Sequence, residues 1–115
     1  MSETIIYGIK ACDTMKKAVK WLDENNIEAR FHDYKKLGAD EAVLQEAITL
    51  HGWETVINRR GTTWRKLPDD VKAAMDEAGA ISAALDNPSL VKRPLLAYQG
   101  KIYLGFSEEL YAEIF

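Results

Sequence analysis

The spacing of hydrophobic and polar positions predicts a strand, a helix and a second strand at the start of the chain. TIIYG at 4–8 is β-branched and aromatic and ends in glycine, as a buried strand followed by a loop does. From Asp13 to Asn25 apolar residues recur at spacings of three and four, which predicts an amphipathic helix. IEARFHDY at 27–34 predicts the second strand. Because a helix joins the two strands, we expect them to be parallel.

The rest of the chain predicts helices followed by a hairpin. GADEAVLQEAITLHG at 38–52 is a helical pattern between glycines, with acidic residues in its first turn. Residues 53–87 predict further helices joined by a loop at NRRGTTWRKLPDD, the last helix being stopped by Pro88. PLLAYQGKIYLGF predicts two antiparallel strands about a Gln99-Gly100 turn, and Ser107 caps a final helix.

The predicted order is βαβ, a helical insertion at approximately 39–87, and then ββα. This α/β order is typical of a thioredoxin/glutaredoxin-like sheet. At 115 residues with 47% hydrophobic content, the chain has the size of one ordinary domain with one core. We therefore expect a single domain over residues 1–115.

Charge and hydropathy exclude several classes of protein. The 15 basic and 18 acidic residues are mixed along the chain, for a formal charge of -3, so no basic stripe indicates a nucleic-acid partner. No apolar run approaches the roughly 20 residues that span a bilayer, and the N-terminus lacks the pattern of a signal peptide. We expect a soluble, cytoplasmic monomer.

Cys12 is the only cysteine, and it falls between the first predicted strand and the first predicted helix. Unpaired amides and the helix dipole favour an anion such as a thiolate there, and Lys10 and Lys16 are nearby cations. A lone cysteine is more often a small buried hydrophobe, but this position favours a reactive thiol. With only two histidines no zinc site is predicted, and a partner thiol must come from another molecule.

Two basic segments are candidates for binding an anion. In KRPLL, Pro94 precedes an apolar strand, and an X-Pro bond can be cis. In a thioredoxin-like domain this proline faces the active cysteine, so Arg93 would lie near the sulfur; a surface arginine beside a turn proline is the alternative. In NRRGTTWRKL, Arg59 and Arg60 precede a flexible Gly61, which fits either an anion pocket or a solvated charge pair.

Four stretches together resemble the ArsC/Spx family of thioredoxin-like proteins, most closely its small YffB-like branch: YGIKACDTMKKA, FHDY, NRRGTTWRKL and NPSLVKRPLLAYQGKIYLGFSEE. The resemblance covers nearly the whole chain. It implies a glutaredoxin-like sheet with a helical insertion. From the family's arsenate reductases it implies a nucleophilic cysteine, oxyanion-binding arginines, and glutathione with glutaredoxin as reductant. By position, it implies Cys12 as the nucleophile and a substrate- or glutathione-binding set of Lys10, Arg59, Arg60, Arg93 and Pro94, with Arg60 favoured over Arg59.

The chain departs from the arsenate reductases at two places. Gly105 and Phe106 stand where those enzymes have a further arginine, and Asp13 stands where they tend to have glycine after the cysteine. Both changes disfavour an incoming arsenate. Met15 occupies the position of the second cysteine of the C-x-x-C switch in the Spx branch, which disfavours a redox-switched regulator.

The sequence therefore predicts a glutathione-linked thiol reductase that uses one nucleophilic cysteine. Its substrate would be an oxidised thiol or an oxyanion, glutathione would be the co-substrate, and no metal or bound cofactor would be required. The alternative is an Spx-like or catalytically silent protein-binding module, which would account for Asp13, Met15 and Gly105 together.

Overall fold

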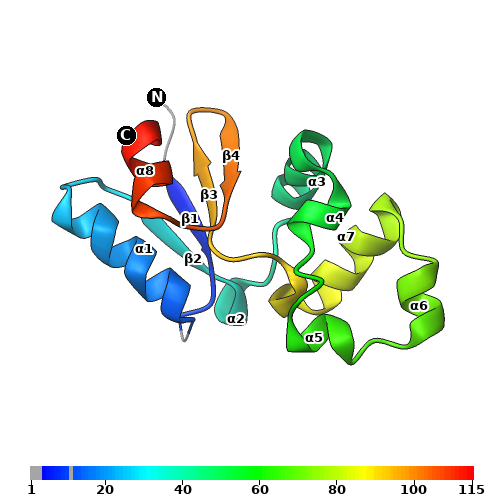
Figure 1. Ribbon diagram of the computed structural model, residues 1–115. Helices are drawn as coiled ribbons and strands as arrows, with labels where there is room; N and C mark the ends of the chain where they lie inside the picture. Colours follow the sequence, from blue (N-terminus) through cyan, green and yellow to red (C-terminus); the bar gives the residue numbers. More distant parts are fainter. Residues whose placement is uncertain (1–3, 11) are drawn as a thin grey trace. The chain divides into compact units, whose positions relative to one another are not determined.

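The computed structural model describes residues 4–10 and 12–115. The chain forms two compact units (Figure 1). Unit 1 comprises Met1–Leu37 and Arg93–Phe115, and unit 2 comprises Gly38–Lys92.

Unit 1 is built on a four-stranded sheet of β1, β2, β3 and β4, in the spatial order β2-β1-β3-β4. The strands are Ile5–Gly8, Arg30–Asp33, Leu95–Tyr98 and Lys101–Leu104. β1 and β2 are parallel, whereas β3 is antiparallel to both β1 and β4. The predicted strands and the parallel pairing of the first two are confirmed.

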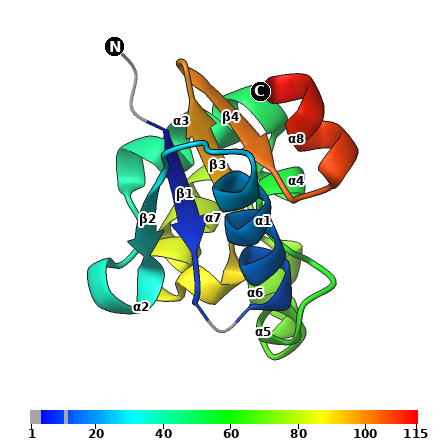
Figure 2. The ribbon, with the colours of Figure 1, turned by 90° about the vertical axis from the view of Figure 1, so that its left-hand side faces the viewer.

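Helices α1 (Asp13–Glu24) and α8 (Glu108–Ile114) cover one face of this sheet (Figure 2). The core between them is a cluster of buried side chains: Ile6, Met15, Ala18, Leu22, Leu96 and Tyr111. The phenol of Tyr111 lies inside this apolar cluster, and its burial raises its pKa well above the ordinary value.

Local signals in the sequence set the ends of these elements. Gln99 and Gly100 join β3 to β4 with φ of 50° and 76°, as a two-residue hairpin turn requires. The hydroxyl of Ser107 accepts a hydrogen bond of 3.0 Å from the Leu110 N–H and so caps α8 as predicted. The short helix α2 (Tyr34–Leu37) was not predicted.

The order of strands and helices in unit 1 is that of a thioredoxin-like fold, βαβ followed by ββα. Along the chain, the predicted helical segment separates the βαβ half from the ββα half. The predicted fold class is therefore confirmed.

Unit 2 consists of short helices. They are α3 (Glu41–His51), α4 (Trp53–Val56), α5 (Thr62–Arg65), α6 (Asp69–Ala73), α7 (Glu77–Asp86) and the 3₁₀ turn Pro88–Leu90. The carboxylate of Asp40 caps α3 by accepting bonds from the N–H groups of Ala42 and Val43. α3 packs against α4 and α7. The segment predicted as one long loop at NRRGTTWRKLPDD contains α5 and the start of α6, so that prediction is wrong in detail.

Among the described residues, no helix has both the length and the apolar character needed to cross a membrane.

Candidate functional site

Cys12 is the N-cap residue of α1, as the sequence predicted. Its backbone is extended, with φ of −80° and ψ of 128°, and its carbonyl accepts the Lys16 N–H at 3.0 Å. Among the residues that the structure describes, no side-chain hydrogen bond caps this end of the helix. The first N–H groups of α1 are therefore left for solvent or for an anion, and they are joined to the residue that carries the thiol. Cys12 is partly buried and its side chain packs against the core of unit 1.

The register of the sheet places Pro94 at the same end of the sheet as the Cys12 loop. Tyr7 pairs with Leu95, and the two strands are antiparallel. The chain that leaves β1 after Gly8 therefore departs beside the chain that enters β3 through Pro94. The Cys12 N–H donates a hydrogen bond to the Ile9 carbonyl at 3.2 Å. The helix start and the Arg93-Pro94 segment thus lie at one end of unit 1.

The Arg93-Pro94 peptide bond is cis, and Pro94 is fully buried while Arg93 is partly exposed. The Pro94 carbonyl accepts the Gly105 N–H at 2.9 Å, so the segment after β4 also reaches this end of the sheet. Neither Gly105 nor the following Phe106 carries a charge. Of the candidate anion-binding residues, Arg93 is therefore the guanidinium that unit 1 itself brings to this end of its sheet.

Lys10 and Lys16 are exposed on either side of Cys12 in the sequence, and both line a hollow on the outer surface of unit 1. Asp13 is also exposed, in the first turn of α1. Met15, at the position of the second cysteine in the Spx branch, is a core residue with 1% exposure. Packing, rather than redox chemistry, therefore accounts for Met15.

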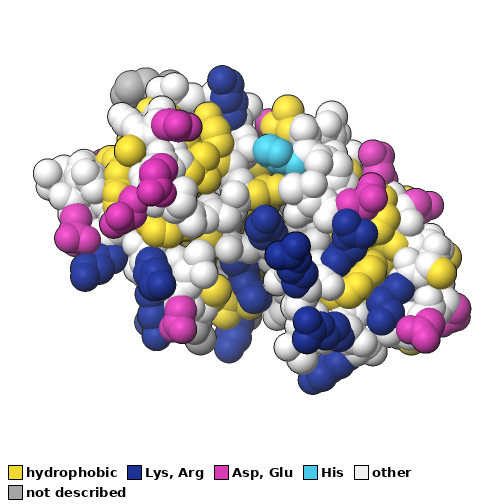
Figure 3. Space-filling view, in the orientation of Figure 1, with side chains coloured by type: hydrophobic (Ala, Val, Ile, Leu, Met, Phe, Trp, Pro, Cys, Tyr) yellow, Lys and Arg dark blue, Asp and Glu magenta, His cyan; other side chains and the backbone are white. Residues whose placement is uncertain are grey.

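Arg59 and Arg60 belong to unit 2, where both are exposed and line a hollow of about 620 Å³ together with Lys92. Figure 3 shows basic side chains gathered over this part of unit 2. The guanidinium carbon of Arg59 lies 5.8 Å from the centre of the Trp53 ring, a cation–π distance. The Arg60 N–H donates to the Asn58 side chain at 3.3 Å. That these arginines act with Cys12 stays a prediction.

Within residues 4–10 and 12–115, no group of three or more His, Cys, Asp or Glu side chains is arranged to hold a metal ion. The chemistry that this end of unit 1 offers comes from a thiol, a helix N-terminus and a guanidinium. A thioredoxin-like sheet with a single cysteine at the start of its first helix, and with Pro94 entering β3 at the same end of the sheet, makes this a single-cysteine protein of the thioredoxin-like class.

The chain belongs to the ArsC family, whose sequence pattern matches residues 7–114. The solved structure of the YffB (PA3664) protein is 51% identical, covers 96% of both chains and superposes with a TM-score of 0.92. An arsenate reductase (ArsC) related protein from Brucella melitensis is 47% identical over 97% of this chain and 93% of its own, with a TM-score of 0.77. The global transcriptional regulator Spx of Streptococcus pyogenes is 30% identical over 86% of this chain and 75% of its own. The resemblance to the ArsC/Spx family is confirmed.

Proposed function

We propose that this protein is a glutathione-linked thiol reductase in which Cys12 is the nucleophile. The observation that carries the proposal is the position of Cys12 as the N-cap of a 12-residue helix whose first turn has no side-chain cap. Membership of a family that includes arsenate-reductase-related proteins supports a thiol-reductase-like activity. Glutathione as the resolving thiol, with glutaredoxin as a further reductant, is the finer part of the proposal.

The reaction proceeds by two thiol–disulfide exchanges. In the first, the Cys12 thiolate attacks one sulfur of an oxidised thiol, a new S–S bond forms, the old one breaks, and the leaving thiolate takes up a proton. In the second, a glutathione thiolate attacks the mixed disulfide and returns Cys12 to the thiolate form. When the substrate is a mixed disulfide of glutathione, Cys12 takes the glutathionyl sulfur, the substrate leaves as its thiol, and the second step yields oxidised glutathione. For any other disulfide the second step yields a mixed disulfide with glutathione, which a second glutathione thiolate reduces, so electrons balance without a metal or bound cofactor.

The neighbouring cations have separate roles in this scheme. Lys10 and the N–H groups of α1 stabilise the thiolate of Cys12. Arg93 pairs through its two-pronged guanidinium with a carboxylate of glutathione, and Pro94 fixes the backbone beside it. Arg60 is the favoured candidate of the middle pair for a further anion contact, as the family resemblance implies. We assign Arg59 a supporting role because its guanidinium lies over Trp53.

Oxidised glutathione should convert Cys12 to a mixed disulfide that carries one glutathionyl group. Intact-mass spectrometry over time measures this adduct, and reduced glutathione should then remove it. The Cys12→Ser variant is the control, because it keeps the fold but has no sulfur nucleophile. A parent protein that stays unmodified while it is folded and reduced would refute the proposed chemistry.

A protein-binding module is the second candidate function, favoured by the Spx relative and by the exposed Asp13 beside the thiol. The burial of Met15 argues against an internal C-x-x-C switch but leaves a binding role open. The oxidised-glutathione experiment separates the two functions, since a silent module has no reason to form and release the adduct.

Arsenate reduction should be weak even with glutathione and glutaredoxin supplied. The structure brings Gly105, which carries no charge, to the end of the sheet where Pro94 lies, and the Asp13 carboxylate sits in the first turn of α1. Both features lower the attraction for an oxyanion. Turnover can be followed by coupled oxidation of NADPH through glutathione reductase. A rate on the order of 1 per second or more, normal for an enzyme, would overturn this expectation.

A further inference from the structure

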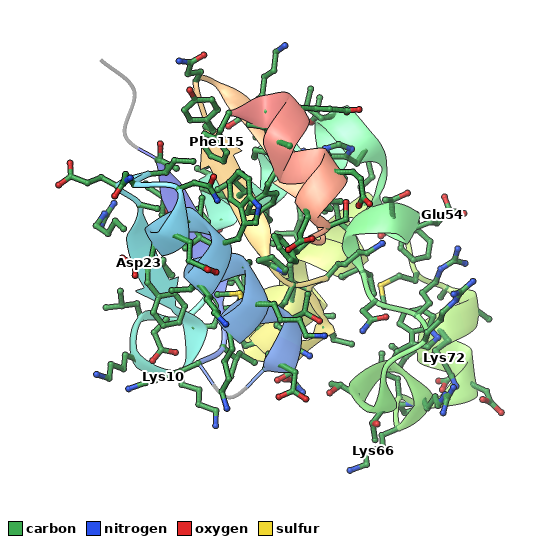
Figure 4. All side chains as sticks on the ribbon, turned by 60° about the vertical axis from the view of Figure 1, so that its left-hand side comes forward. Lys10, Asp23, Glu54, Lys66, Lys72 and Phe115 are labelled. Atoms are coloured by element: carbon green, nitrogen blue, oxygen red, sulfur yellow. The ribbon has the colours of Figure 1, made fainter. Side chains whose placement is uncertain are left out.

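Apart from Lys10, the residues that line a groove on the surface of unit 1 have no role in the chemistry described so far. The groove has a volume of about 570 Å³, within the usual size range of ligand pockets, and it lies between α1 and β2. Its lining residues are Lys10, Met15, Lys16, Val19, Lys20, Asp23 and Phe31. We refer to this set as the α1–β2 groove. Figure 4 shows Lys10 and Asp23 on the same flank of unit 1.

The floor of the groove is apolar and accessible. Val19 and Phe31 are 42% and 36% exposed, although both are large hydrophobic residues. A second, smaller hollow of about 140 Å³ shares Val19, Asp23 and Phe31 with the groove and is otherwise lined by apolar residues, including Ile27 and Ala29. The groove therefore continues into an apolar recess at its Asp23 end. Such a recess has room for one bulky apolar side chain.

The charges along the rim are ordered from one end to the other. Lys10, Lys16 and Lys20 contribute three ammonium groups, whereas Asp23 stands alone at the end near the recess. Met15, Val19 and Asp23 follow one another at four-residue spacing, so they lie along one stripe of α1. Cys12 is the N-cap of α1, one turn before Met15 and Lys16. The basic end of the groove is therefore the end nearer to Cys12.

The dimensions match a short extended peptide. From Met15 to Asp23 the helix axis advances by about 12 Å, because each residue adds about 1.5 Å. An extended chain covers that distance with about three to four residues at roughly 3.3 Å each. A bulky apolar side chain in the recess would therefore place acidic residues two to three positions away beside Lys10 and Lys16.

We propose that the α1–β2 groove binds an acidic peptide segment of a partner protein, anchored by one bulky apolar residue in the recess. The ammonium rim attracts the carboxylates, and burial of the anchor against Val19 and Phe31 adds hydrophobic stabilisation. A further step rests on the proposed function: the partner is a protein substrate whose oxidised cysteine reaches Cys12 when the segment is docked.

The binding step is tested with fluorescein-labelled acetyl-Phe-Gly-Asp-Asp-amide and its reversed sequence, by fluorescence anisotropy on the Cys12→Ser protein. We expect at least one orientation to bind about tenfold more tightly than matched peptides with Lys in place of Asp or Ser in place of Phe. Binding should weaken in 1 M salt, where screening acts over roughly 3 Å. Equal affinity for the acidic and basic peptides would overturn the proposal.

Charge reversals on α1 supply a matched set of variants. Lys16 and Lys20 line the groove, whereas Lys17 is exposed on the same helix but does not line it. Lys16→Glu and Lys20→Glu should each weaken binding of the acidic peptide by about fivefold or more, and Lys17→Glu by less than about twofold. Circular dichroism confirms that each variant is folded. If Lys17→Glu loses as much affinity as Lys16→Glu, the peptide is attracted nonspecifically to α1, and the proposal that it binds in the groove is refuted.

The substrate step is tested with the same peptides carrying one cysteine as its mixed disulfide with thionitrobenzoate. Attack by Cys12 forms the Cys12–peptide disulfide and releases the coloured thionitrobenzoate anion, which is followed by absorbance. The acidic peptide should react about fivefold faster or more than its basic counterpart. If oxidised glutathione reacts but peptide charge has no effect, the docking proposal fails and the proposed function stands. If the peptide binds but neither disulfide reacts, the proposed function fails and the groove stands.

Discussion

Replacing Arg93 with alanine should slow adduct formation between Cys12 and oxidised glutathione by roughly ten- to a hundredfold. The magnitude follows from the loss of one charge-assisted hydrogen bond, worth about 1.5 to 3 kcal/mol. The structural basis is that Arg93 precedes the buried Pro94, at the end of the sheet where the chain leaves β1 toward Cys12. Arg93→Lys should restore only part of the rate, because an ammonium keeps the charge but loses the two-pronged geometry.

Lys101 provides the matched control for this experiment. It is an exposed cation at the start of β4, where it pairs with Tyr98 at the opposite end of the sheet from Pro94. Lys101→Ala should therefore react at close to the parent's rate. Rates are compared by intact mass, with circular dichroism to establish folding. A folded Arg93→Ala protein that reacts as fast as Lys101→Ala would remove Arg93 from the site.

The elements around Cys12 were predictable because their signals are local. The three- and four-residue spacing of apolar positions defines α1, and the turn between β3 and β4 is marked by Gly100, which tolerates positive φ. Cys12 could be placed at a helix start for the same reason. The pairing of β1 with β3 brings Pro94 to that end of the sheet. This pairing is not a local signal, and it could be expected only because the order of elements is that of a thioredoxin-like domain.

The short helices were not predictable in this way. α2 and α5 have four residues each, too few for an amphipathic period to develop. The Asp33 carboxylate accepts the Lys35 N–H at 3.0 Å and so forms the turn that starts α2. An aspartate before an apolar-poor stretch such as YKKL is a weak signal, since the same residue is common in turns that do not continue as helices.

The α1–β2 groove was missed because periodicity shows which helix face is apolar but not how much of that face is covered. Val19 belongs to the same apolar spacing as Met15, Ala18 and Leu22, yet it is 42% exposed while those three are buried. Phe31 is a residue of β2, and its exposure depends on how much of that strand α1 covers. Coverage of this kind is a tertiary property and appears only when the elements are packed together.

Gly8→Ala should lower the free energy of unfolding by about 1 to 3 kcal/mol, the usual cost of overpacking a core. A Cβ at Gly8 would overlap the Sδ of Met15, and Met15 is 1% exposed with the core of unit 1 around it. The methionine can yield only by displacing other buried side chains. Urea unfolding monitored by circular dichroism measures the change, and the midpoint should fall at an unchanged m-value.

A double-mutant cycle assigns the cost of Gly8→Ala to this one contact. Met15→Ala alone leaves a cavity and should cost about 2 to 5 kcal/mol. In the double variant the new methyl group no longer meets the Met15 sulfur, so the combined loss should be smaller than the sum of the single losses by at least about 0.5 to 1 kcal/mol. Losses that add within about 0.3 kcal/mol would show that the methyl group at position 8 acts elsewhere. Close packing against Gly8 would then not explain why this chain has a buried methionine one turn after Cys12.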